Sequence, residues 1–92
     1  MSVTAEQQEQ VMGVISRVAQ AEGVDRDRAR GLVHRFVCQG KCGWYRREAE
    51  KVGFKKGDIT PAQEETIEEA IAQLMEGLTL EEAMAHIHEV IC

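Results

Sequence analysis

The side chains best suited to bind a metal ion fall in two short clusters. One holds His34, Cys38 and Cys42, the other holds His86, His88 and Cys92, and the chain has no other histidine or cysteine. Residues four apart lie on one face of a helix. Thiolate sulfur and imidazole nitrogen are the usual ligands of structural zinc, so a zinc site could draw on both clusters. The candidate metal ligands are His34, Cys38, Cys42, His88 and Cys92.

Packing is the competing explanation for these residues, and we favour it. Neither Cys-x3-Cys nor His-x3-Cys is the tight Cys-x2-Cys pattern of a strong zinc signal. Cysteine is also a small residue that proteins readily bury. On a helical wheel His34 and Gly31 form a small uncharged face beside the apolar one. Such a face suits close approach by another helix, for example from a second subunit. We expect no bound cofactor, with zinc as the alternative.

Charge is divided very unevenly along the chain. All 11 lysines and arginines lie between Arg17 and Lys56, and residues 26–56 carry ten of them against three carboxylates. Residues 57–92 hold nine carboxylates and no lysine or arginine, and the whole chain carries a net charge of −5. The two blocks are neutralised by each other, within or between subunits, or the basic block is reserved for a polyanion.

The basic block (residues 26–56) could bind either nucleic acid or protein. Two short helices joined by a glycine-containing turn are the outline of a DNA-reading unit. The net charge of −5 and the long turn at 39–43 count against that function. We favour pairing of these cations with the glutamates of residues 64–82 across a protein contact. The candidate binding residues for either function are Arg28, Arg35, Trp44, Arg46, Arg47 and Lys51.

The elements that must position these residues begin at clear helix starts. Three capping boxes are present, formed by Thr4 with Gln7, Thr60 with Gln63, and Thr79 with Glu82. In each, the threonine hydroxyl accepts from the backbone N–H three residues on, and the Gln or Glu side chain reaches back. Asp25 is a candidate cap for a further helix. Gly77 followed by Leu78 has the pattern of a helix stop, a left-handed glycine with an apolar clasp.

Apolar residues recur at the helical period in four stripes, and no strand-length stretch alternates with period two. Helices are therefore predicted at about 5–22, 26–38, 44–52, 61–76 and 80–91. We expect a single all-α domain over residues 1–92, a compact bundle of about five short helices ending in an antiparallel helical hairpin. The stripes are Val11, Val14, Ile15 and Val18; Ala29, Leu32, Val33, Phe36 and Val37; Ile67, Ala70, Ile71, Leu74 and Leu78; and Leu80, Ala83, Met84, Ile87, Val90 and Ile91.

Size and composition limit the classes of function. A chain of 92 residues builds a thin core alone and often gains stability from a partner, so we expect a homodimer. Phosphate-binding loops, nucleophile elbows and metalloprotease motifs are missing from the sequence, and we expect no catalysis. The sequence shows no long apolar run and no signal-peptide pattern, and its odd number of cysteines favours reduced thiols, so we expect a cytoplasmic protein. The favoured function is self-association and protein contact, with a nucleic-acid-binding regulator and a small zinc-binding protein as the alternatives.

Overall fold

The fold is built from helices. The computed structural model describes residues 4–39, 43–47, 51 and 59–91, and within those ranges no strand occurs. The expected all-α fold is confirmed, and four of the five predicted helix ranges agree with the structure to within two residues at each end. The helices are α1 (Ala5–Glu22), α2 (Arg26–Cys38), α3 (Gly43–Arg47), α4 (Pro61–Leu74) and α5 (Leu80–Ile91).

The expected number of helices needs correction, because the structure forms four helices of full length rather than about five. Of the segment predicted as a helix at 44–52, the structure describes α3, which spans five residues, and Lys51, while 48–50 and 52 lie outside the described residues. Five residues complete little more than one helical turn, and a first turn fixes several residues for a single hydrogen bond. Arg46 and Arg47 of α3 are exposed, so these two side chains add no apolar burial to stabilise it.

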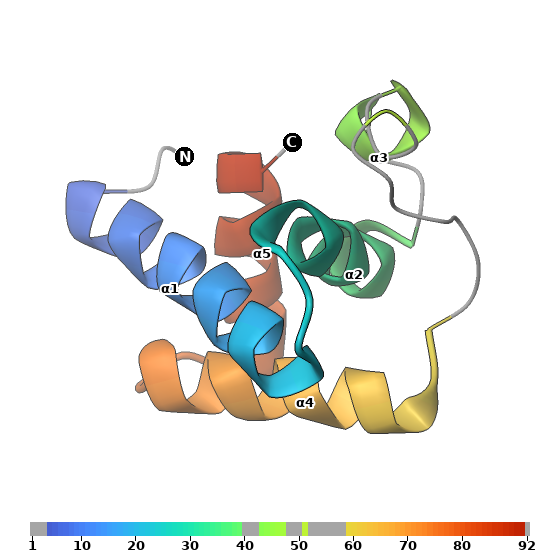
Figure 1. The fold of residues 1–92 in the computed structure, drawn as a ribbon. Coiled ribbons are helices and arrows are strands. Elements are labelled where there is room, and N and C mark those ends of the chain that lie inside the picture. Colours follow the sequence, from blue (N-terminus) through green and yellow to red (C-terminus); the bar gives the residue numbers. More distant parts are fainter. Residues whose placement is uncertain (1–3, 40–42, 48–50, 52–58, 92) are drawn as a thin grey trace.

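The expected antiparallel hairpin at the end of the chain is also wrong. Figure 1 shows α5 rising steeply from the end of α4 instead of folding back along it. The turn between them contains Gly77, which adopts the expected left-handed conformation with φ 86°. The cause lies in packing, since α5 makes more extensive contact with α2 and α1 than with α4. Its apolar face is therefore buried against two helices from the first half of the chain.

All three capping boxes are present in the structure. The hydroxyls of Thr4, Thr60 and Thr79 each accept from a backbone N–H at 3.1 Å, and the paired Gln or Glu side chain accepts from the threonine N–H. The N–H of Thr79 holds the pKa of the Glu82 carboxyl below its usual range. Asp25 caps α2 as expected, with its carboxylate 2.8 Å from the backbone nitrogen of Arg28.

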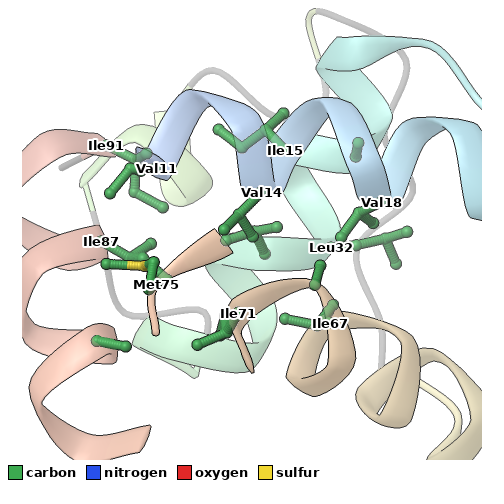
Figure 2. Packing of buried hydrophobic residues seen from close by; sticks show 14 of the residues in the cluster. Val11, Val14, Ile15, Val18, Leu32, Ile67, Ile71, Met75, Ile87 and Ile91 are labelled. Atoms are coloured by element: carbon green, nitrogen blue, oxygen red, sulfur yellow. The ribbon is translucent and has the colours of Figure 1, made fainter. Parts of the chain in front are cut away.

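The core lies where α1, α2, α4 and α5 meet, and Figure 2 shows aliphatic side chains from all four helices converging there. Of the predicted apolar residues, Leu80 alone is strongly exposed, at 41%. Met75, which the prediction omitted, is buried just beyond the end of α4. The buried apolar side chains are Val11, Val14, Ile15, Val18, Ala19, Ala29, Leu32, Val33, Ile67, Ala70, Ile71, Met75, Ala83, Ile87 and Ile91.

The fold places α3 far from the turn between α4 and α5. A radius of gyration of 12.0 Å matches the roughly 12 Å expected of a compact chain of this length. In Figure 1, α3 stands at the upper right and the turn between α4 and α5 lies at the lower left, at opposite ends of the molecule. Among the described residues no helix is long and apolar enough to cross a membrane.

Candidate functional site

The contact between α2 and α5 contains a fully buried histidine. His34 has 0% of its surface exposed and is the one buried polar side chain of the described core. Its Nδ1 atom lies 2.8 Å from the carbonyl oxygen of Arg30, one turn earlier in α2. Its Nε2 atom lies 3.1 Å from the carbonyl oxygen of Ile91, in the last turn of α5. His34 therefore links the two helices through a carbonyl that the end of α5 leaves without an intrahelical partner.

Burial and hydrogen bonding shift the pKa of His34 in opposite directions. Burial lowers the pKa of His34 because a charged ring loses its hydration there, and the positive charge of Arg30 and the nearby His88 act in the same direction. The two carbonyls raise its pKa, since only the protonated ring can donate to both of them. Burial has the larger effect, so the ring is more easily kept neutral than an exposed histidine. A neutral imidazole has one N–H and donates to one of the two carbonyls at a time.

One turn along the same contact, the two predicted clusters meet. The Sγ atom of Cys38, at the end of α2, lies 3.2 Å from the Nδ1 atom of His88 on α5. Cys38 is half-buried, whereas His88 is exposed. Burial raises the pKa of the Cys38 thiol, which keeps it protonated and able to donate to the imidazole nitrogen. The contact therefore joins a thiol and an imidazole from two helices at a position that solvent can reach.

The structure divides the predicted metal ligands into three groups. Cys38 and His88 are brought together, while both ring nitrogens of His34 face backbone carbonyls. Cys42 and Cys92 lie outside the described residues. Within the described part of the chain, no three histidine, cysteine or carboxylate side chains gather as a metal site would require. His34 and Gly31 are both buried, and His34 contacts α5 of the same chain through the Ile91 carbonyl.

The predicted cationic residues lie mostly on the surface. Arg28, Arg46, Arg47 and Lys51 are exposed, Arg35 is half-buried, and the side chain of Trp44 lies outside the described part. Arg28 and Arg47 therefore offer their charge to solvent or to a partner.

Part of the basic block makes no ion pair with the acidic helices α4 and α5 among the described residues. Among the described residues, no ion pair joins Arg26, Arg28 or Arg47 to a glutamate of α4 or α5. The shape of the molecule explains this separation for Arg47, because α3 and the turn between α4 and α5 stand at opposite ends (Figure 1). For Arg26, Arg28 and Arg47, the structure thus gives no support for ion pairs with the acidic helices of the same subunit.

A groove of about 400 Å³ lies at the turn between α4 and α5. Its floor is formed by Ile71 and Met75, both buried, and by the half-buried Leu78. Glu68 and Glu76 stand exposed at its rim, and Leu80 lines it while remaining 41% exposed. We refer to this feature as the acidic groove. It offers apolar surface and negative charge side by side, which is the composition of a surface that binds a cationic and partly apolar partner.

Sequence reasoning missed two of these features. The acidic groove depends on the steep turn into α5, which leaves Leu80 exposed and Met75 beneath it, and no periodicity rule predicts that angle. The link that His34 forms between α2 and α5 was missed because a histidine beside an apolar stripe is compatible with several environments. The small Gly31 beside it was the one available signal, since it allows a second helix to come close.

Comparison with known proteins gives no relative for this chain: no family model, no curated protein and no solved structure matches it.

Proposed function

We propose that the protein is a self-associating helical module in which the acidic groove of one copy binds the basic block of a second copy. The single observation that carries the proposal is the groove itself, with an apolar floor, an exposed leucine and a glutamate rim. A second copy supplies the complementary chemistry, because its residues 26–56 contain ten cations and the only tryptophan and tyrosine of the chain. Aromatic and arginine side chains are the residues most enriched at protein interfaces.

The separation of charge favours a contact between copies over one within a copy. Among the described residues, the exposed Arg26, Arg28 and Arg47 make no ion pair with the glutamates of α4 and α5. Two copies arranged side by side in opposite directions pair each basic end with the other's acidic groove. A two-fold arrangement of this kind forms the same contact twice and leaves no open end, which limits assembly to a dimer. Charge pairs at its rim set orientation and partner choice, and burial of the exposed Leu80 side chain adds apolar contact.

Sedimentation velocity on paired charge reversals tests the contact. The wild-type protein is expected to sediment as a dimer that weakens with added salt. Arg46→Glu with Arg47→Glu, and separately Glu68→Lys with Glu76→Lys, should each give a monomer, because like charges then face each other. Mixing the two monomeric variants should restore a mixed dimer, in which every contact again joins opposite charges. Glu6→Lys with Glu9→Lys is the matched control on the exposed side of α1 and should leave the dimer intact.

Two results would overturn the proposal. One is a wild-type protein that stays monomeric at micromolar concentration. The other is a mixture of the two charge-reversed variants that does not associate, which would separate the dimer from this pair of surfaces. If the wild-type monomer instead binds mixed-sequence duplex DNA with an affinity that falls steeply with salt, the basic block serves nucleic acid and the self-association proposal is rejected.

A further inference from the structure

We propose that the acidic groove binds an aliphatic diamine or polyamine, a hydrocarbon chain with a positive charge at each end. The inference starts from the order of the residues that line the groove, in which a carboxylate stands at either end of an apolar stretch of α4. Binding of such a small cation requires no second copy. A diamine in the groove excludes the basic block of a second copy, so it also regulates self-association, and that consequence alone rests on the proposed function.

One side of the groove is a single helix face. The lining residues of α4 and of the turn that follows it occupy positions 68, 71, 72, 75 and 76, a spacing that places residues on one side of a helix. The backbone N–H of Met75 donates to the carbonyl of Ile71 at 2.8 Å, which continues the hydrogen bonding of α4 by one residue. Glu68 therefore lies at one end of this face and Glu76 at the other. The helical rise separates their backbones by about 12 Å.

The apolar surface that a ligand can cover lies between these two carboxylates and on the segment after α4. Ile71 and Met75 are already buried, so a ligand gains little by covering them. Ala72 and Leu80 are exposed, the latter at 41%, and Leu78 is half-buried. A chain of methylene groups in contact with these three side chains removes apolar surface from water on both molecules. The middle of the ligand is therefore expected to be hydrocarbon.

The two carboxylates favour a ligand with two separated cations. Glu68 and Glu76 are both exposed, and neither makes an ion pair with any other residue in the described part of the chain. One exposed ion pair contributes little by itself. Two charges on one chain bind together, because the first contact raises the effective concentration of the second. The groove volume of about 400 Å³ lies within the range of about 300 to 1,000 Å³ typical of small-molecule sites.

NMR titration of methyl signals tests the site in the wild type and in the Arg46→Glu with Arg47→Glu variant, which keeps every residue of the groove. The probe is a linear diamine with a chain of eight carbons. It should shift the methyl signals of Leu78 and Leu80 in the variant, and less readily in the wild type, where a second copy competes. The monoamine of the same chain length should bind up to about fivefold more weakly, the contribution of one exposed ion pair. A three-carbon diamine, too short to reach both carboxylates, should bind no more tightly than the monoamine.

Substitutions in the variant background separate the groove from the overall charge of the protein. Glu68→Gln and Glu76→Gln should each reduce the affinity for the eight-carbon diamine to that for the monoamine. Glu69→Gln is the matched control, because it removes the same charge from an exposed position of α4 outside the groove. It should bind the diamine as the unsubstituted variant does. All three positions are exposed, so the helical circular dichroism spectrum should be retained in each.

The outcomes distinguish this inference from the proposed function. The diamine site is overturned if the eight-carbon diamine shifts no groove signal in either protein, if the monoamine binds equally well, or if Glu69→Gln loses as much affinity as Glu68→Gln. A wild type that is monomeric and still binds the diamine supports the site and rejects the dimer. A wild-type dimer whose groove binds no diamine in either protein supports the dimer and rejects the site.

Discussion

The contact between α1 and α4 and the contact between α2 and α5 hold the molecule together in different ways. The first is the most extensive contact between helices, and its buried side chains are aliphatic on both sides. The second also buries apolar residues but adds His34 between two backbone carbonyls and the thiol–imidazole pair of Cys38 and His88. The hydrophobic effect has no direction, whereas a hydrogen bond depends on the position of each atom.

That difference assigns separate roles to the two contacts. The contact between α1 and α4 supplies stability in proportion to the apolar surface it removes from water. The contact between α2 and α5 fixes where the last helix sits, because shifting α5 by one turn would move the Ile91 carbonyl away from His34. It also holds the imidazole of His34 and the thiol of Cys38, whose protonation depends on pH. We therefore expect substitutions in the first to change stability most, and those in the second to change how stability responds to conditions.

The largest loss of stability is expected from shortening a buried side chain in the contact between α1 and α4. Ile67→Ala removes a side chain that is 1% exposed, and should lower the free energy of unfolding by about 2 to 5 kcal/mol, through lost burial and the cavity left behind. Urea denaturation followed by circular dichroism measures it. Met12→Ala is the control on an exposed position of α1, with an expected change within about 0.5 kcal/mol. Equal losses for the two variants would contradict the assignment of the core.

A smaller effect is expected from removing the link between α2 and α5. His34→Phe keeps an aromatic ring of similar shape but has no N–H, so the Ile91 carbonyl retains only the longer bond from the Arg30 guanidinium, at 3.3 Å. The expected loss is about 1 to 3 kcal/mol, the cost of an unmet buried hydrogen bond. His34→Gln keeps an N–H donor and should lose less. Amide hydrogen exchange should locate the change in the last turn of α5. A His34→Phe protein as stable as the wild type would remove the proposed role of the link.

Local sequence signals predicted the helices well because the helix starts are local. Each capping box is complete within four residues, so Thr4, Thr60 and Thr79 could be placed without knowledge of the rest of the fold. The apolar stripe of α1 likewise identified its buried face, since a helix period alone determines which residues share a side. The grouping of the histidines and cysteines in two clusters also predicted, as the zinc alternative, that His34, Cys38 and His88 share one region.

The arrangement of helices was not predictable from the same signals. The direction of α5 depends on which helices its apolar face meets, and Ala83, Ile87 and Ile91 would suit either α4 or α2 as a partner. Leu80 was assigned to the core because it fits the stripe, and it is exposed because the steep turn at Gly77 carries it outward. The pairing of Cys38 with His88, out of several combinations of the two clusters, follows from that same direction. One unpredicted angle thus determines both the acidic groove and the thiol–imidazole pair.

The smallest expected effect is the change in the free energy of unfolding with pH that His34 causes. Its sign shows whether burial or hydrogen bonding has the larger effect on the pKa of His34. Burial lowers the pKa of His34 in the folded protein, whereas an unfolded histidine has a pKa of about 6.5. Between those two values the unfolded chain binds more protons, so the free energy of unfolding should decrease as pH falls below about 6.5. The groups known to face the ring are Arg30 on its own helix and His88 on α5, and both oppose a charge on it.

The difference between wild type and His34→Gln isolates this contribution, because the other titrating groups are common to both. Their free energies of unfolding, measured in urea from about pH 5 to about pH 7.5, bracket the ordinary histidine pKa. The wild type should lose stability relative to His34→Gln as pH decreases. The effect should be smaller than that of His34→Phe, because a protonated ring still donates to both carbonyls and recovers part of its cost of burial. The wild type could instead become more stable than His34→Gln as pH decreases. In that case the two carbonyls stabilise the protonated ring, and hydrogen bonding has a larger effect on the pKa of His34 than burial has.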